Sequence, residues 1–348
     1  MLCKTLPISA SGLAILLTLA LPPRLAAQEA SGDFYKGKTV TIVTSTGPGG
    51  VYDLVARLAA RFMPKHLPGS PSMVVQNMPG GGNVLASNYM YDIAPKDGTA
   101  IAVVNNAVPL NQVLDGRGVR FDSRKFNWIG STGGRNEAVF ILRSAGVNSV
   151  AELKNKEIVL GGTAPGSSIV IYPAAMNNVL GTKFKIVTGY KSSTEVFLAM
   201  ERGEITARSG SLASIYAGFP KWIEDKKIVF VAQIGPKRDK DLSDVPLLTE
   251  LATTDEQRRV LALISSPATL GQPYLAPPGL PDERVAVLRK AFMMTMEDSE
   301  FQAAAAKAQV DLSPITGEEI ADIVRDVVGA SPEIIAKARA AVRSDSSK

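Results

Sequence analysis

The sequence is poor in the side chains on which most enzyme centres depend. Its 348 residues include one cysteine, Cys3, and one histidine, His66. Cys3 precedes the apolar run of an expected leader, so the mature chain has no disulfide. One histidine excludes a histidine-based metal site, and a Ser-His-Asp set would have to use His66 itself. His66 follows a predicted helix end in Pro64-Lys65-His66-Leu67-Pro68, which predicts a solvated surface loop without a role in binding.

Signals for cofactors and for nucleic acid are also weak. The turn Gly47-x-Gly49-Gly50-x-x-Asp53 lacks the third glycine of a dinucleotide fingerprint, and no acidic residue ends a strand about 20 residues on. Acidic residues are scattered and form no EF-hand-like loop. The formal net charge of +5 falls to +3 without Lys4 and Arg24, and no dense basic stripe is present. We therefore expect no cofactor, no metal and no nucleic-acid partner.

The longest apolar run, residues 13–21, is too short for a membrane-spanning helix, which needs about 20 apolar residues. It follows Lys4 and precedes Leu25-Ala26-Ala27, which is the layout of a signal peptide. An uncleaved anchor is the alternative. We expect residues 1–27 to be a signal peptide that is cleaved near Ala27, and the protein to be periplasmic.

The rest of the chain is organised around one strand, one glycine turn and one helix start, residues 38–57. Thr39 to Ser45 predicts a strand, and apolar positions from Val51 to Phe62 recur with helical spacing. Unpaired backbone N–H groups at such a helix start point at one place and can hold an anion. A purely structural glycine turn is the alternative, because glycine is the default residue of tight turns.

Strands and helices alternate along the chain, which favours a mostly parallel α/β architecture. The first lobe is expected to contain residues 28–132 and to be completed by residues 266–348, with helices at 282–297, 317–328 and 332–342. The second lobe is expected to contain residues 133–265, with Ser131-Thr132-Gly133-Gly134 crossing between the two. In open α/β sheets, ligands bind at the carboxyl ends of the strands.

Small hydroxyl residues and glycines recur at four of these predicted strand ends. They let backbone N–H and side-chain O–H groups approach an oxyanion without a full positive charge. This favours reversible anion binding over catalysis, since no general base is evident. The four groups are Thr44-Ser45-Thr46, Gly80-Gly81-Gly82-Asn83, Thr163 with Gly166-Ser167-Ser168, and Ser192-Ser193-Thr194.

Four motifs in order then resemble the substrate-binding receptors of tripartite tricarboxylate transporters, also called Bug-type periplasmic solute receptors. The resemblance covers most of the mature chain and is strongest in residues 34–99. The motifs are Phe34-Tyr35-x-Gly37-Lys38-x-Val40-x-Ile42-Val43, Pro48-Gly49-Gly50-x-x-Asp53-x-x-Ala56-Arg57, Asn77-x-Pro79-Gly80-Gly81-Gly82 and Pro95-x-Asp97-Gly98-Thr99.

The resemblance implies a two-lobed, class II periplasmic-binding-protein-like fold with a ligand cleft between the lobes. It also implies a non-enzymatic receptor that closes on a small organic acid and delivers it to transporter subunits in the membrane. The acid is expected to be a di- or tricarboxylate, an aromatic acid or an acidic amino acid, and the receptor a monomer. A periplasmic module that senses a carboxylate and presents the closed form to a signalling receptor is the alternative function.

Site residues carried over from the family come from loops of both lobes. Asp53 either caps free N–H groups or meets the ligand, and Arg57 is expected to pair with Asp53. Tyr190 either walls the cleft or packs. Arg208 lies where another strand end should reach the cleft and could meet a second carboxylate, whereas Lys191 either meets a second carboxylate or lies on the surface. The expected ligand-binding set is Ser45, Thr46, Gly49, Gly50, Asp53, Thr163, Gly166, Ser167, Ser168, Tyr190, Ser193, Thr194 and Arg208.

Two loops depart from the family pattern. Pro79-Gly80-Gly81-Gly82-Asn83 stands where the family has Pro-Gly-Ala-Gly-Gly, and Thr188-Gly189-Tyr190-Lys191-Ser192 stands where it has Val-Pro-Tyr-x-Gly. The second loop is expected to face the ligand. The ligand of better-known members is therefore not transferred to this chain.

Overall fold

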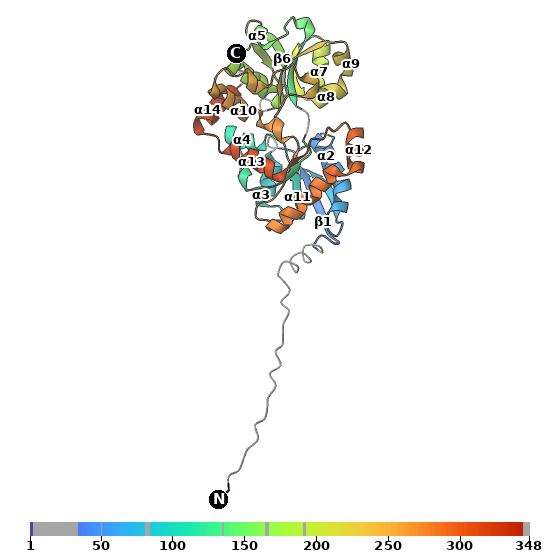
Figure 1. Ribbon diagram of the computed structural model, residues 1–348. Coiled ribbons are helices and arrows are strands. Elements are labelled where there is room, and N and C mark those ends of the chain that lie inside the picture. Colours follow the sequence, from blue (N-terminus) through green and yellow to red (C-terminus); the bar gives the residue numbers. More distant parts are fainter. Residues whose placement is uncertain are drawn as a thin grey trace.

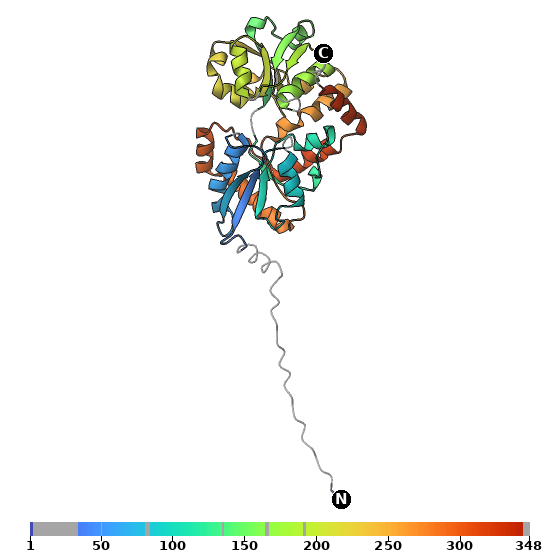
Figure 2. The same ribbon diagram turned by 180° about the vertical axis from the view of Figure 1, so that it is seen from behind.

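A computed structural model describes residues 1–2, 34–49, 51–80, 84–133, 136–163, 167–190 and 193–343. The expected leader falls almost wholly outside these residues. The described chain forms two lobes, one above the other in Figures 1 and 2, and each lobe is built on one mixed β-sheet with helices against it. The predicted α/β class is confirmed.

The first sheet has six strands within the described residues, in the order β11-β4-β10-β3-β1-β2. β1 pairs in parallel with β2 and β3, β10 is antiparallel to β3 and β4, and β11 is antiparallel to β4. The carboxyl ends of β1, β3 and β4 therefore lie at one edge. The bounds are β1 (Thr39–Thr44), β2 (Ser72–Asn77), β3 (Ala100–Val103), β4 (Asn127–Ser131), β10 (Pro273–Ala276) and β11 (Ile315–Thr316).

The second sheet has five strands within the described residues, in the order β7-β6-β8-β5-β9. β6 is parallel to β7 and β8, whereas β5 is antiparallel to β8 and β9. The carboxyl end of β8 thus lies beside the amino end of β5, where Ser211 pairs with Glu137. The bounds are β5 (Glu137–Leu142), β6 (Ile158–Gly161), β7 (Phe184–Val187), β8 (Ala207–Ser211) and β9 (Ile228–Ile234).

Helices flank both sheets. Around the first sheet lie α2 (Val51–Phe62), η1 (Met63–His66), α3 (Val84–Asp92), α4 (Val108–Leu114), η3 (Ser123–Lys125), α11 (Asp282–Glu297), α12 (Ser299–Lys307) and α13 (Gly317–Val328). Around the second lie η4 (Arg143–Ala145), α5 (Val150–Leu153), α6 (Ser168–Ala175), η5 (Met176–Leu180), α7 (Ser193–Glu201), α8 (Leu212–Gly218), α9 (Pro220–Glu224), η6 (Lys240–Leu242) and η7 (Leu248–Leu251). Two further helices, α10 (Asp255–Leu270) and α14 (Pro332–Ala341), pack together at the side of the molecule (Figure 1).

The strand β1 is buried on both faces, which explains its continuous β-branched sequence. Val40 and Ile42 enter the hydrophobic cluster formed with α2 and α11, whereas Val43 enters a second cluster on the opposite face. Successive side chains of a strand point to opposite faces, so adjacent residues serve different cores. This strand is thereby fixed in the centre of the lobe, with the loop after Thr44 held at the sheet edge.

The helix α2 has the predicted bounds but a different buried face. Val51 was expected to be part of the apolar stripe, yet 45% of it is exposed. Tyr52 and Ala56 are buried together with Val55 and Ala59. The helix is turned so that Tyr52 reaches the backbone that follows β3, a tertiary contact that helical periodicity does not encode.

Several helices were not anticipated from the sequence, among them α4, α10 and α12. Residues 108–114 and 299–307 are the helices α4 and α12. The helix α10 continues through Ser265, Ser266 and Pro267, which the sequence suggested as a break. Its first turn is capped by Thr254, which accepts a hydrogen bond from the Gln257 N–H. A proline near the end of a helix is tolerated when packing against neighbouring helices offsets the lost hydrogen bond.

The chain leaves the first sheet after β4 and returns to it before β10, with Thr132, Gly133, Gly271 and Gln272 as the described residues next to these strands. The Ser131 hydroxyl donates to the Leu270 carbonyl at 2.7 Å, which ties these two parts of the chain together. Gly133 (φ +72°) and Gly271 (φ +60°) lie against each other, and a Cβ on Gly271 would fall 2.5 Å from the Gly133 carbonyl oxygen. Both positions therefore require glycine, for its backbone conformation and for the close approach.

No helix in the described ranges combines the length and the apolar character that crossing a bilayer requires.

Candidate ligand-binding site

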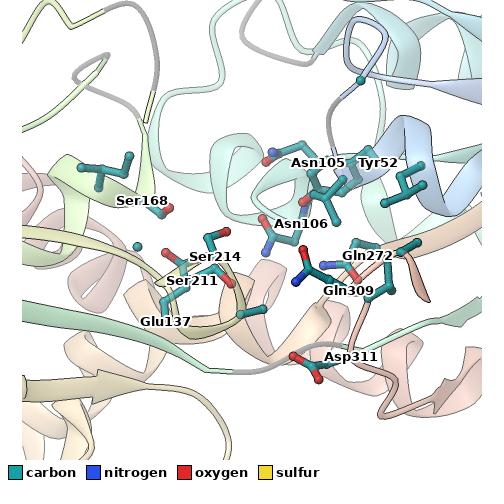
Figure 3. A pocket seen from close by; sticks show the side chains of 18 of the residues that line it. Tyr52, Asn105, Asn106, Glu137, Ser168, Ser211, Ser214, Gln272, Gln309 and Asp311 are labelled. Atoms are coloured by element: carbon teal, nitrogen blue, oxygen red, sulfur yellow. The ribbon is translucent and has the colours of Figure 1, made fainter. Parts of the chain in front are cut away.

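A cavity of about 580 Å³ lies between the two lobes and is lined by residues of both. In Figure 3, Glu137, Ser168, Ser211 and Ser214 face Tyr52, Asn105, Asn106, Gln272 and Gln309 across this space. A volume of this size suits a small solute. Its described lining consists of Gly49, Val51, Tyr52, Leu54, Asn105, Asn106, Glu137, Ser168, Ile169, Arg208, Gly210, Ser211, Ala213, Ser214, Gln272, Ala308, Gln309, Val310 and Asp311.

The sheet topology explains why these residues meet. Gly49 follows β1 and Asn105 follows β3, so both lie at the carboxyl edge of the first sheet. Ser168 comes after β6, and Arg208 lies in β8, which is parallel to β6. The cavity is thus at the carboxyl ends of parallel strands from both sheets, the place where open α/β sheets bind ligands.

Arg208 is a buried cation in the wall of the cavity. Only 2% of the residue is exposed, and its guanidinium carbon lies 4.0 Å above the centre of the Phe197 ring. Its Nε donates to the Ser209 carbonyl at 3.0 Å. Burial lowers the pKa of Arg208 to about 10, although the charge of Glu137 opposes this shift, and the side chain stays charged at neutral pH. A fixed guanidinium of this kind recognises carboxylates.

Glu137 lines the same cavity from the first residue of β5. Burial raises the pKa of its carboxyl to about 7, against a hydrogen bond from Ser168 and the charge of Arg208, which both lower it. The carboxyl is therefore divided between its two protonation states near neutral pH. It can accept hydrogen bonds when ionised and donate one when protonated.

The opposite wall presents amide groups held by buried hydroxyls. The Asn105 N–H donates to the Ser45 hydroxyl at 2.9 Å, and the Asn106 N–H donates to the Tyr52 hydroxyl at 3.0 Å. The Asn106 side chain donates to the Pro267 carbonyl at 2.8 Å. Ser45 is fully buried, so its role in the described structure is to position the loop that carries Asn105.

The glycine turn after β1 is anchored by Asp53. Its carboxylate accepts from the Gly49 N–H at 3.0 Å, from two Arg57 nitrogens at 2.9 Å each, and from the Asn77 amide at 2.9 Å. Hydrogen bonds from Arg57 are the largest influence and help to lower the pKa of Asp53 to about 2. The expected pairing of Arg57 with Asp53 is confirmed.

A family model for the tripartite tricarboxylate transporter receptors matches residues 55–339, well over half of the chain. The chain belongs to this receptor family. A Cupriavidus necator protein, described as the UPF0065 protein in the gbd 5′ region, is 25% identical over 316 residues, which cover 89% of this chain and 90% of the relative. The predicted family membership is thereby confirmed.

Two solved structures share the fold of this receptor. A TctC solute-binding protein from Polaromonas, without ligand, has a TM-score of 0.66 and 19% identity, over 88% of this chain and 99% of that one. The MatC protein of Rhodopseudomonas palustris with bound malate has a TM-score of 0.60 and 18% identity, over 88% and 99%. The periplasmic-binding-protein-like fold is confirmed, and the protein is a solute-binding receptor and not an enzyme.

The structure brings part of the predicted binding set to the cavity of the receptor. Gly49, Ser168 and Arg208 line it. Ser45 supports Asn105 from behind, and Asp53 is occupied by its three partners. Gly50, Gly166 and Lys191 lie outside the described residues, as do the side chains of Ser193 and Thr194, which begin α7.

The other members of the set lie near the cavity without lining it in the described structure. Thr46 accepts a hydrogen bond from Asn77 through its carbonyl oxygen. The Thr163 hydroxyl donates to the Ser167 hydroxyl at 3.1 Å, beside the start of α6. Tyr190 packs against the hydrophobic cluster around Phe140 and Phe197, in agreement with the second of its two sequence interpretations.

Sequence reasoning missed much of the lining. Glu137 and Asn105 stand at strand ends and were detectable by that position, but neither belongs to a glycine-rich turn. Gln309 has a positive φ of 57° just after α12, a helix that was itself not anticipated. Gln272 and Asp311 come from segments that only the return of the chain to the first lobe brings to the cavity.

Two further observations concern residues away from the cavity, and the first of them is a correction. His66 is not in a solvated loop, because it lies in η1 and its Nε2 is 2.9 Å from an Asp298 carboxylate oxygen. Gly32-x-x-x-x-Gly37-Lys38-Thr39 has the letter spacing of a phosphate-binding loop. Thr39, however, begins a strand instead of a helix, and the Lys38 ammonium lies 3.3 Å above the Phe34 ring centre, so the described residues do not form such a loop.

Within the described residues, no group of three or more His, Cys, Asp or Glu side chains is arranged to hold a metal ion.

Proposed function

We propose that this receptor captures a small organic carboxylate in the inter-lobe cavity by closure of the lobes, and delivers it to a tripartite tricarboxylate-type transporter in the membrane. The observation that carries the proposal is Arg208, a charged side chain that is 98% buried and lines the cavity. A charged guanidinium in the wall of a cavity presents N–H groups in a planar fork that matches the geometry of a carboxylate. A ligand carboxylate is therefore the group that this wall is suited to recognise.

Two glycines beside the first sheet support closure as the mode of capture. Gly133, just after β4, and Gly271, just before β10, lie against each other where the chain leaves the first sheet and returns to it. Hinges are short stretches that absorb large backbone changes. A rotation there changes the distance between Glu137 and the Asn106 wall, and so opens or closes the cavity on a solute.

Binding is tested by a thermal-shift screen of the protein, expressed with its own leader, against monocarboxylates, dicarboxylates, tricarboxylates, aromatic acids and amino acids. A ligand at 100 times its dissociation constant adds about 2.7 kcal/mol to the stability of the folded state. A raised melting temperature with any carboxylate supports the proposal. No shift with the whole panel, in protein shown by mass spectrometry to be free of bound solute, contradicts it.

Export is part of the proposal. We infer that residues 1–27 direct the chain to the periplasm and are removed near Ala27, in line with the periplasmic receptors that share its fold. Intact-mass analysis of the protein from a periplasmic extract is expected to give a chain that begins close to residue 28. An intact leader in that fraction argues for an anchored form.

Delivery needs a separate experiment. Uptake of the identified solute into cells is expected to depend on both this receptor and membrane components that co-purify with it. Solute-dependent capture of a signalling receptor, with uptake unchanged when the gene is deleted, would instead indicate a sensory module.

A further inference from the structure

We propose that the solute is a small amino acid, with one carboxylate held by Arg208 and one ammonium group held by Glu137. This inference rests on the proposed function and names the chemical class of its ligand. It concerns the two charged side chains that the second sheet places in one wall of the cavity.

The strand register fixes how these two side chains are placed. β5 and β8 are antiparallel neighbours, with Phe140 opposite Arg208 and Glu137 opposite Ser211. Glu137 is three residues from Phe140 along β5, so its side chain leaves the opposite face of the sheet from that of Arg208, at the sheet edge. The Arg208 guanidinium reaches towards the same edge, because a Cβ on Gly210 would lie 2.9 Å from one of its nitrogens. Both side chains line the same cavity, and the charge of each affects the pKa of the other. A ligand that carries two opposite charges, separated by a few carbon atoms, matches this arrangement.

The charges of the described lining argue against a dicarboxylate. Arg208 is its single basic side chain, whereas Glu137 and Asp311 are acidic, and every other described lining residue is uncharged. A dicarboxylate would bring its second negative group towards acidic side chains in a partly buried site, where like charges repel strongly. A zwitterion instead pairs each of its charges with the opposite charge.

The protonation behaviour of Glu137 makes the inference measurable. The groups that face it are Arg208 from β8, Ser168 and Tyr172 from α6, and Tyr52 from α2. Burial raises the pKa of both tyrosines above the ordinary value, so neither phenol ionises near neutrality. The Glu137 carboxyl, with its pKa raised to about 7, is therefore the group among these that titrates between pH 6 and 8.

The sign of the proton exchange separates the two ligand classes. An ammonium group stabilises the ionised carboxylate, so amino acid binding lowers the pKa of Glu137, releases a proton and strengthens as pH rises from about 6 to about 8. A second carboxylate stabilises the protonated carboxyl, which can donate a hydrogen bond to it. Dicarboxylate binding then takes up a proton and weakens over the same interval.

The experiment is calorimetric titration of the purified protein with two matched ladders of ligands. One ladder is glycine, β-alanine, 4-aminobutyrate and 5-aminopentanoate. The other is the dicarboxylates malonate, succinate, glutarate and adipate, with unsubstituted monocarboxylates as a third set. Titration at pH 6, 7 and 8, in buffers with different ionisation enthalpies, gives affinity and proton exchange together. We expect one amino acid to bind at least about tenfold more tightly than the dicarboxylate of the same chain length.

Glu137→Gln tests the assigned contact, and Glu204→Gln is the matched control. Glu204 is an exposed acidic residue of the same lobe, paired with Arg202 away from the cavity. Glu137→Gln is expected to weaken amino acid binding at least about tenfold, to abolish proton release, and to leave monocarboxylate binding within about threefold. Glu204→Gln is expected to behave as the unmodified protein in all three respects.

Tighter binding of dicarboxylates with proton uptake overturns this inference but leaves the proposed carboxylate receptor intact. Amino acid binding that Glu137→Gln does not weaken overturns it as well. Failure of every ligand that bears a carboxylate, in protein free of bound solute, contradicts the proposed function itself. A melting temperature of Glu137→Gln close to that of the unmodified protein establishes that any lost binding is local.

Discussion

The two lobes contribute different chemistry to the cavity between them. The second lobe supplies a buried cation and a buried acid, Arg208 and Glu137, with the Ser168 hydroxyl between α6 and the sheet. The first lobe supplies amides and backbone groups, among them Asn105 and Asn106 after β3. Buried charge is therefore concentrated on the second lobe, whereas the first lobe offers mainly neutral hydrogen-bonding groups together with the exposed acid Asp311.

This difference suggests an order of events. Electrostatic attraction acts over longer distances than hydrogen bonding, so a charged solute is expected to engage the second lobe first. Amide groups bind only at short range, and the first lobe therefore contributes once the lobes have closed. The comparison predicts that substitutions in the second lobe decide whether a solute binds, and that substitutions in the first lobe adjust how tightly the closed form holds it.

The largest effect is expected for Arg208→Gln. The change removes the positive charge but keeps a hydrogen-bonding side chain of similar reach, and it should weaken carboxylate binding about 100-fold, because hydrogen bonds to charged groups contribute about 1.5–3 kcal/mol. Calorimetric titration measures this loss. Arg202→Gln, at an exposed ion pair of the same lobe, is the control. Equal ligand affinities of Arg208→Gln and the unmodified protein would show that Arg208 does not bind the ligand carboxylate, and would contradict the role given to the second lobe.

A smaller effect on the same lobe is expected for Gly210→Ala. A Cβ at this position would lie 2.9 Å from an Arg208 guanidinium nitrogen and would displace the guanidinium. We expect about tenfold weaker binding with an almost unchanged melting temperature, since the guanidinium is the flexible end of its side chain. Gly218→Ala is the control, because no atom lies within 4 Å of its added Cβ. Unchanged affinity would mean that the guanidinium position is not critical.

On the first lobe, Asp53→Asn should affect stability more than recognition. The pKa of Asp53 is lowered to about 2 in the folded protein. The ionised carboxylate therefore contributes its full share to the free energy of unfolding above the unfolded pKa of about 4, and this share is lost as pH falls from about 4 to about 2. Because Arg57 is half exposed, we expect a loss of about 1–2 kcal/mol at pH 7 that disappears near pH 2. Urea unfolding at several pH values measures this, with Asp92→Asn as the control. A constant difference across that range would exclude an ionic contribution.

The smallest effect is expected for His66→Ala. The imidazole contacts Asp298, which immediately precedes α12 in the first lobe. Lys65 also pairs with Asp298, so this carboxylate keeps one of its partners when His66 is replaced. We expect a loss of less than about 1 kcal/mol in stability and no change in affinity. A strong loss of ligand binding would show that the contact between His66 and Asp298 affects closure of the two lobes. It would contradict the expectation that this contact is independent of the cavity.

Much of the fold was predictable because its signals are local. β1 and α2 were placed almost to the residue by a β-branched run and by helical spacing of apolar side chains. The Ser149 cap of α5 was also predictable, because a serine just before a helix start is a common sequence pattern. Its hydroxyl accepts a hydrogen bond from the N–H of the residue three positions later, here Glu152. By contrast, α10 contains Pro267 and two serines, and its helical state depends on packing against α14 and α13.

The candidate site was predictable in part for the same reason. Gly49 and Ser168 lie in or beside glycine turns at strand ends, and Arg208 lies in a predicted strand whose end was expected to reach the cleft. Tyr52 was assigned only to a helix, since the turn of that helix towards Asn106 depends on the packing of α2. The one signal for Glu137 was its position at a strand end, and that signal is weak because an acidic residue at a strand start is ordinary until burial raises its pKa.

The sequence by itself determined the α/β class, the receptor family and the presence of glycine-rich turns at strand ends, because strand propensity, helical periodicity and motif spacing are properties of short segments. Tertiary structure alone decided which groups share the cavity. Arg208 and Glu137 are 71 positions apart, and they meet because β5 and β8 pair in one particular register. Their protonation depends on exclusion of water by both lobes, which no segment of the chain produces alone.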